Sequence, residues 1–123
     1  MTYSQKSILA EKSYAFAVRI VNMSRFLSSE EKEFILAKQV LRSGTAIGAL
    51  VKESKRAESK ADFSHKLNIA LKEAEETLYW LSLLKDTSYI DEKMYESMHK
   101  DCDELISMLV TSINTAKRNT KNK

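Results

Sequence analysis

The sequence predicts an all-α protein, an antiparallel up-down-up-down four-helix bundle, from three observations. The 123 residues include no proline and only two glycines, whereas an all-β fold needs turn residues every few positions. Apolar residues recur at helical spacing in four long segments. Short polar links separate these segments, and helices joined by short links usually pack as antiparallel neighbours.

The first helix is expected from about Ser7 to Phe26, with a core face of Leu9, Phe16, Ile20, Met23 and Leu27. In the link that follows, Ser28 and Glu31 have the spacing of a capping box for the next helix. We therefore expect the second helix to run from about Ser29 to Arg56.

The second helix contains both glycines, Gly44 and Gly48, which are four residues apart and so share one helix face. Glycine inside a helix costs about 1 kcal/mol relative to alanine. The pair therefore indicates a close approach by another helix. That helix belongs either to the same bundle, which is the default, or to another subunit.

Ser59 is expected to cap a third helix that runs to about Lys85, and Asp91 to cap a fourth helix that fades near Ala116. These segments complete a single bundle domain of residues 1–116. Residues 117–123 contain four basic residues and no apolar residue, so we expect a disordered, mobile basic tail.

The net charge of +3 is unevenly distributed, with +5 in residues 1–60, −6 in residues 61–116 and +4 in the remaining seven residues. This asymmetry suits nucleic-acid contact, and equally the packing of basic helices beside acidic ones. No apolar run approaches the roughly 20 residues of a membrane span, and the N-terminus lacks a signal-peptide pattern. A single cysteine excludes an intrachain disulfide. We expect a soluble, cytoplasmic protein that does not contact membranes.

No catalytic pattern is present in the sequence. There is no Ser/His/Asp arrangement, P-loop or dinucleotide fingerprint, and Cys102 has no CxxC partner. Glu96 and His99 have the Glu-x-x-His spacing of di-metal bundle sites, but His65 and His99 would lie about 31 Å and about 12 Å from their shared turn. We therefore expect no enzyme activity, no metal and no cofactor.

Residues 41–49 (LRSGTAIGA), 56–63 (RAESKADF) and 79–81 (YWL) resemble the bacterial four-helix-bundle proteins of the 23S rRNA intervening-sequence type. That family is similar to the accessory variability determinant of diversity-generating retroelements, a basic homopentamer that binds nucleic acid and a reverse transcriptase. The resemblance implies a four-helix bundle that forms a homo-oligomer, with a ring of five as the expected form.

Five residues are candidates for a subunit interface: Gly44, Gly48, Leu50, Tyr79 and Trp80. Ala46 and Leu50 replace the Ser and Asn that are usual in the resembling family, and they add apolar surface to the second helix. Tyr79 and Trp80 are adjacent, so both rings cannot face one core line. One ring either reaches an interface, where such residues are enriched, or covers the end of the bundle.

A basic stripe on the second helix is the candidate nucleic-acid site, and it consists of Lys38, Arg42, Lys52 and Arg56. The alternative is an ordinary solvated face that pairs with Glu73, Glu75 and Glu76. Two functions follow from these alternatives. One is a homo-oligomer that binds RNA or DNA phosphates, and the other is an oligomeric scaffold that binds a protein partner without nucleic-acid contact.

Overall fold

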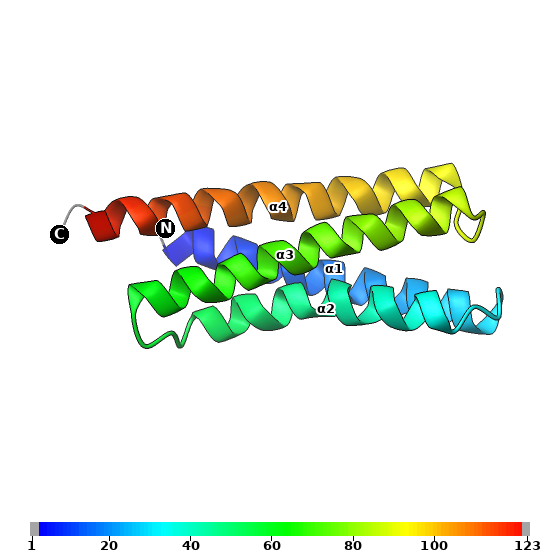
Figure 1. Ribbon diagram of the computed structural model, residues 1–123, viewed down its shortest axis with the longest axis horizontal. Coiled ribbons are helices and arrows are strands. Elements are labelled where there is room, and N and C mark those ends of the chain that lie inside the picture. Colours follow the sequence, from blue (N-terminus) through cyan, green and yellow to red (C-terminus); the bar gives the residue numbers. More distant parts are fainter. Residues whose placement is uncertain (1–2, 122–123) are drawn as a thin grey trace.

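Four long α-helices form the part of the chain that the computed structural model describes, residues 3–121, with side chains described for residues 8–119. They are α1 (Tyr3–Ser29), α2 (Ile35–Ser54), α3 (Lys60–Asp86) and α4 (Glu92–Lys121). Each helix runs antiparallel to the one before it, so that the bundle is up-down-up-down (Figure 1). The predicted all-α fold class is confirmed.

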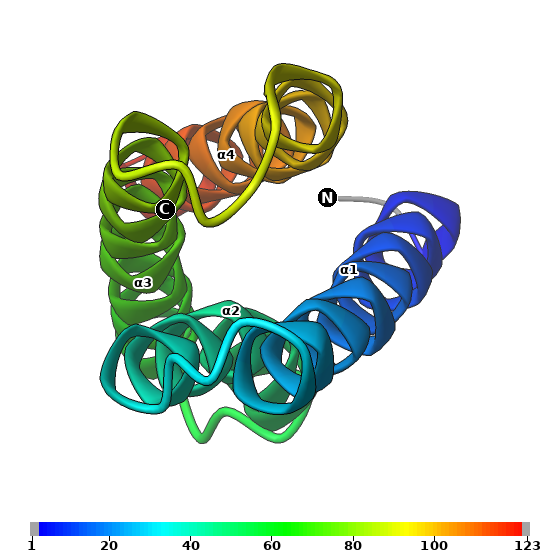
Figure 2. The same cartoon turned by 90° about the vertical axis from the view of Figure 1, so that its right-hand side faces the viewer.

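The bundle is open along one edge. Viewed along its length, α1, α2, α3 and α4 follow one another around an incomplete ring (Figure 2). Each helix packs closely on the next, whereas α1 and α4 approach each other least of the neighbouring pairs. Two ion pairs, Lys12–Glu104 and Arg19–Asp101, join α1 to α4.

One hydrophobic core joins all four helices along the length of the bundle. The largest side chains that are almost wholly buried are Phe16, Leu9, Ile20, Leu27, Ile47, Leu67, Leu81, Leu84, Met98, Leu105, Leu109 and Val40. The five core positions that the sequence predicts on the first helix are all buried. Burying side chains of this size is the main stabilising term, at about 1.5–3 kcal/mol each.

The two glycines of α2 seat α1 of the same chain. A Cβ placed on Gly44 would lie 2.6–2.8 Å from three side-chain atoms of Ile20. A Cβ on Gly48 would lie 3.2 Å from the Ser13 carbonyl oxygen of α1. The close approach that the glycine pair indicates therefore comes from within the bundle, which is the default alternative, and both glycines are covered by α1.

Buried hydroxyl groups fix the register between neighbouring helices. Thr77 Oγ1 donates to Ser43 Oγ across 2.9 Å, between α3 and α2. Ser24 Oγ of α1 donates to the Ala37 carbonyl oxygen of α2 across 3.1 Å. Because a buried polar group without a partner costs about 1–3 kcal/mol, these bonds favour one axial alignment of the helices.

The first link differs from the prediction. Helix α1 continues to Ser29, and α2 begins only at Ile35, so Ser28 and Glu31 do not form a capping box. Instead, Glu33 Oε1 accepts the Leu36 N–H across 2.7 Å. Lys32 turns the chain with a φ of 54°, in the left-handed region. The carboxylate that satisfies the start of α2 thus lies two residues later than the predicted one.

The later helix starts agree with the sequence, but two ends do not. Ser59 accepts the Asp62 N–H across 3.0 Å, and Asp91 accepts the Met94 N–H across 2.8 Å. Helix α2 ends at Ser54, so Arg56 lies in the link. Helix α4 continues past Ala116 to Lys121. The predicted tail is therefore helical up to that residue, and residues 122–123 lie outside the described part.

Candidate nucleic-acid interface

Three of the four predicted stripe residues are exposed cations. Lys38 and Lys52 project from α2, and Arg56 follows in the link. Within residues 8–119, where side chains are described, none of these three side chains makes an ion pair. They are free to attract an anion.

Arg42, the fourth stripe residue, is neutralised by α3. Its Nη1 lies 3.0 Å from Glu73 Oε2, and its Nη2 pairs with Glu76. The Glu76 carboxylate also accepts the Trp80 Nε1–H across 3.3 Å. The predicted pairing with α3 acids is therefore confirmed for Arg42. Because the charge of Arg42 is neutralised, the stripe has a gap: Lys38 and Lys52 are 14 residues and hence about 21 Å apart along the helix.

A second group of cations gathers where the α2–α3 link meets the end of α4. A hollow of about 300 Å³ is lined by Lys55 and Lys60 from one side and by Ala116 and Asn119 from the other. Two segments far apart in sequence thus meet at one end of the bundle, on the left of Figure 1. We call this end of the bundle the basic end and define it by the cations in and beside the link and near the end of α4, which are Lys52, Lys55, Arg56, Lys60, Lys117 and Arg118.

Acidic residues near the basic end neutralise little of it. Glu53 pairs with Lys66 at 3.6 Å, on the neighbouring helix. The Asp62 carboxylate accepts the Glu58 N–H across 3.2 Å and so serves the start of α3. Glu58 lies in the link itself, so three carboxylates lie near the six cations of the basic end and a net positive charge remains there.

The opposite end of the bundle is acidic. The links between α1 and α2 and between α3 and α4 both lie there, on the right of Figure 1. They and their flanks expose Glu30, Glu31, Asp86, Asp91 and Glu92, which we call the acidic end. The two ends of the bundle therefore differ in charge, although the acidic end also exposes Lys32 and Lys93.

Of the predicted interface residues, only Tyr79 remains well exposed, at 60%. Gly44 and Gly48 are covered by α1, and Leu50 and Trp80 pack against the core. The physical reason is that α2 has two neighbours, which divide its broad apolar face between them. The Tyr79 and Trp80 rings meet in an edge-to-face arrangement, with 5.0 Å between ring centroids.

Sequence reasoning missed exposed apolar side chains on α1 and at the start of α2. Tyr14 is 72% exposed, Val18 is exposed on the same outer face of α1, and Ile8 is exposed near the start of the helix. Ile35 of α2 is 75% exposed. Tyr14 and Val18 are four residues apart on the side of α1 away from its core line. That spacing is a signal in the sequence. It is hard to recognise because a helix with apolar residues on both faces has the pattern of a fully buried helix.

Comparison with known proteins now decides the family. A model of the 23S rRNA-intervening sequence protein family matches residues 5–111. The chain belongs to this family. Its fold is also that of a protein of unknown function from the S23 ribosomal protein family of Bacteroides thetaiotaomicron VPI-5482, known from a crystal structure. The two are 52% identical with a TM-score of 0.89, and the match covers 89% of this chain and 98% of the other.

No curated protein matches the chain, so the family and fold rest on these two findings. Within residues 3–121, no helix is long and apolar enough to cross a membrane. The same residues contain no group of three or more His, Cys, Asp or Glu side chains that could hold a metal ion. His99 instead packs its ring against Tyr95, with 5.5 Å between centroids.

The single cysteine of this family member is a core residue. Cys102 is fully buried and its Sγ contacts the Ala74 carbonyl oxygen at 3.4 Å. Burial, reinforced by the negative charges of Asp103 and Asp101, raises the pKa of the Cys102 thiol to about 12. The thiolate is the reactive form of cysteine, so this side chain is not a nucleophile at neutral pH.

Two results should follow for Cys102. Ellman's reagent at about pH 8 should label the native protein at least about 100-fold more slowly than the unfolded protein, because the thiol is both buried and protonated.

The second result concerns stability. Between the ordinary pKa of the thiol, 9.0, and its pKa of about 12 in the folded protein, only the unfolded state loses the proton. Stability should therefore fall as pH rises through this window, by up to about 1.4 kcal/mol per pH unit. Cys102→Ala should lack this part of the slope, and fast labelling of native protein would contradict the burial.

Proposed function

We propose that this protein is a non-enzymatic homo-oligomer that binds RNA or DNA phosphates through its basic end. The observation that carries the proposal is that the cation-rich α2–α3 link and the last turns of α4, which include Lys117 and Arg118, meet at one hollow at this end of the bundle. Lysine and arginine that neutralise phosphates release counterions, which gives sequence-independent and steeply salt-dependent binding.

The distance between the two charged ends supports binding at one of them. Helix α2 alone has 20 residues, which corresponds to about 30 Å. The Debye length at physiological ionic strength is only about 8 Å. The acidic end therefore does not cancel the attraction of phosphates to the basic end, and the low net charge of +3 understates the local field.

Self-assembly is supported by exposed apolar side chains on different helices. Tyr14 and Val18 lie on the outer face of α1, and Ile35 of α2 and Tyr79 of α3 are exposed as well. Helices α1 and α3 are not neighbours in the bundle. A contact that joins two different surfaces of a subunit is heterologous, and its repetition can close into a ring. The ring of five that the family resemblance implies is one such closed form.

The second candidate function is an oligomeric scaffold for a protein partner. It is favoured by the pairing of Arg42 with Glu73 and Glu76, which removes one cation from the predicted stripe. In the first function the remaining cations bind phosphates, and in the second they do not. Removing charges from the basic end therefore distinguishes the two functions.

Removing four charges from the basic end should lower the affinity for single-stranded RNA by about 100-fold at low salt. The variant carries Lys52→Gln, Lys55→Gln, Arg56→Gln and Lys117→Gln. Each lost phosphate contact reduces the slope of log affinity against log salt by about 0.7, so the slope should fall by up to about 3. Fluorescence anisotropy over a salt series gives both quantities.

The matched control removes four exposed lysines elsewhere, with Lys38→Gln, Lys72→Gln, Lys93→Gln and Lys100→Gln. Both variants have the same net charge, so only the position of the charge differs. The control should stay within about threefold of the wild type. Equal losses in the two variants would show that general charge, rather than the basic end, governs binding. A wild type that binds no RNA or DNA favours the scaffold.

A further inference from the structure

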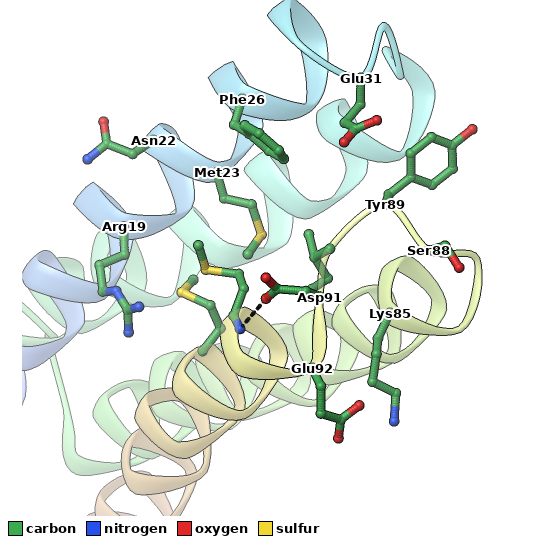
Figure 3. Close-up of a pocket in the computed structure, with 13 residues that line it drawn as sticks. Arg19, Asn22, Met23, Phe26, Glu31, Lys85, Ser88, Tyr89, Asp91 and Glu92 are labelled. Carbon is green, nitrogen blue, oxygen red and sulfur yellow. Dashed lines mark hydrogen bonds between the residues drawn. The ribbon is translucent and has the colours of Figure 1, made fainter.

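A groove lies between α1 and α4 at the acidic end, where this loosest pair of helices separates (Figure 3). Its volume is about 750 Å³, and α1, α4 and both links at this end contribute to its lining. The lining extends from Arg19 to Phe26 on α1 and from Glu92 to Met98 on α4. At ~1.5 Å per residue these stretches are about 10 Å long, or two helical turns.

The groove has an apolar floor and partly exposed apolar walls. Met23, Ile90 and Met98 are buried at its floor, whereas Phe26 is 42% and Met94 40% exposed. Methionine side chains are flexible and polarisable, and they adapt to apolar groups of different shapes. The walls therefore present apolar surface that an inserted side chain would cover.

Among the residues that line the groove, three carboxylates outnumber two cations. Its two cations are engaged within the chain, since Arg19 Nη1 lies 2.6 Å from Asp101 and Lys85 Nζ lies 4.3 Å from the Tyr95 ring centroid. Lys85 also pairs with Asp86 at 3.7 Å. By contrast, Glu31 and Glu92 make no ion pair with any described residue.

We propose that this groove binds a basic amphipathic helix of a partner protein. Apolar side chains of that helix enter between Phe26 and Met94, and its lysine or arginine side chains face Glu31 and Glu92. A groove two turns long suits anchors spaced i, i+3 or i+4, and i+7 along a docked helix. The groove lies at the end away from the basic end, so the proposal does not depend on nucleic-acid binding.

A second copy of the chain fits this groove less well. The cations of the basic end lie at the far end of the bundle, and exposed lysines nearer the groove, such as Lys93 and Lys100, alternate with acidic residues along α4. A copy that used the cations of its basic end here would stack end to end, and a head-to-tail stack that does not close grows into a filament. Charge complementarity therefore favours a different, basic partner.

The probe is a fluorescent peptide of about 14 residues, built from leucine and lysine with leucine on one helical face. Two comparison peptides have glutamate in place of lysine, or the same composition scrambled to remove the helical spacing. The wild-type protein should bind the leucine–lysine helix at least about tenfold more tightly than either comparison peptide. Failure to bind it at about 1 mM, or equal affinity for all three, would overturn the proposal.

Variants locate the site. Phe26→Lys with Met94→Lys should lower peptide affinity at least about tenfold, whereas Val110→Lys, at a similarly exposed position of α4, should not change it. Glu31→Lys with Glu92→Lys should shift the preference toward the glutamate peptide. Circular dichroism checks that each variant keeps its helices. Equal binding by the groove variant and the Val110 control would place the peptide elsewhere and contradict the proposal.

Light scattering distinguishes a partner from a second copy. The Phe26→Lys, Met94→Lys variant should keep the mass of the wild type and its affinity for RNA. A mass that falls in this variant but not in Val110→Lys would show that another subunit fills the groove, and would overturn the proposal. The basic-end variant should lose RNA binding and keep peptide binding. That result would show that the groove and the basic end bind their partners independently.

Discussion

Replacing Gly44 with valine is expected to lower the free energy of unfolding by about 3 kcal/mol. Even the first carbon of a side chain at this position would lie 2.6–2.8 Å from Ile20, closer than packed atoms allow. Ile20 is fully buried in the core and cannot move aside without displacing its own neighbours. Helices α1 and α2 must therefore separate. Urea unfolding followed by circular dichroism measures the change.

Two controls separate packing from helix propensity. Ala49→Val introduces the same side chain at an exposed position of α2 and should cost less than about 0.7 kcal/mol. Gly48→Ala places a Cβ 3.2 Å from the Ser13 carbonyl oxygen. There the gain in helix propensity of about 1 kcal/mol offsets most of the crowding. A Gly44→Val variant as stable as Ala49→Val would mean that Gly44 does not seat α1.

The second large effect concerns assembly. Tyr14→Glu together with Val18→Glu should convert the proposed oligomer into a monomer of 14.1 kDa, because charges buried at the interface would replace apolar side chains of the α1 surface. Both positions are exposed in the isolated chain, so the fold itself should be retained. Light scattering at micromolar concentration gives the mass.

Val110→Glu is the control for assembly, since Val110 is exposed on α4 away from the proposed surfaces. It should leave the oligomer intact. An unchanged mass in the double variant would exclude the outer face of α1 as an interface. A stable dimer or trimer of the wild type would contradict the ring of five but would still agree with self-assembly.

The fold could be predicted from the sequence because its determinants are local. Helical periodicity locates the four helices, and Ser59 and Asp91 mark two of their starts through bonds to amides three residues on. The first link shows the limit of such signals. Ser28, Glu31 and Glu33 all have suitable chemistry, and the packing of Leu27 in the core extends α1 past the predicted boundary.

The candidate site could be predicted only in part because its members come from separate segments. Sequence spacing identified the cations of α2, but the partners of Arg42 lie on α3, 31 and 34 residues away. The basic end combines the α2–α3 link with α4 beyond the predicted end of that helix. The groove between α1 and α4 likewise arises from how two non-consecutive helices separate, for which the sequence offers no periodic signal.

Sedimentation of the wild-type protein with a fluorescent single-stranded RNA tests the central claim most directly. Without RNA, the protein should sediment as a multiple of 14.1 kDa. At about 50 mM salt the RNA should sediment with the oligomer, and at about 500 mM it should be released, because binding rests on phosphate neutralisation. A 14.1 kDa species at every concentration, or RNA that sediments alone at low salt, would contradict a self-assembling protein that binds nucleic acid through its basic end.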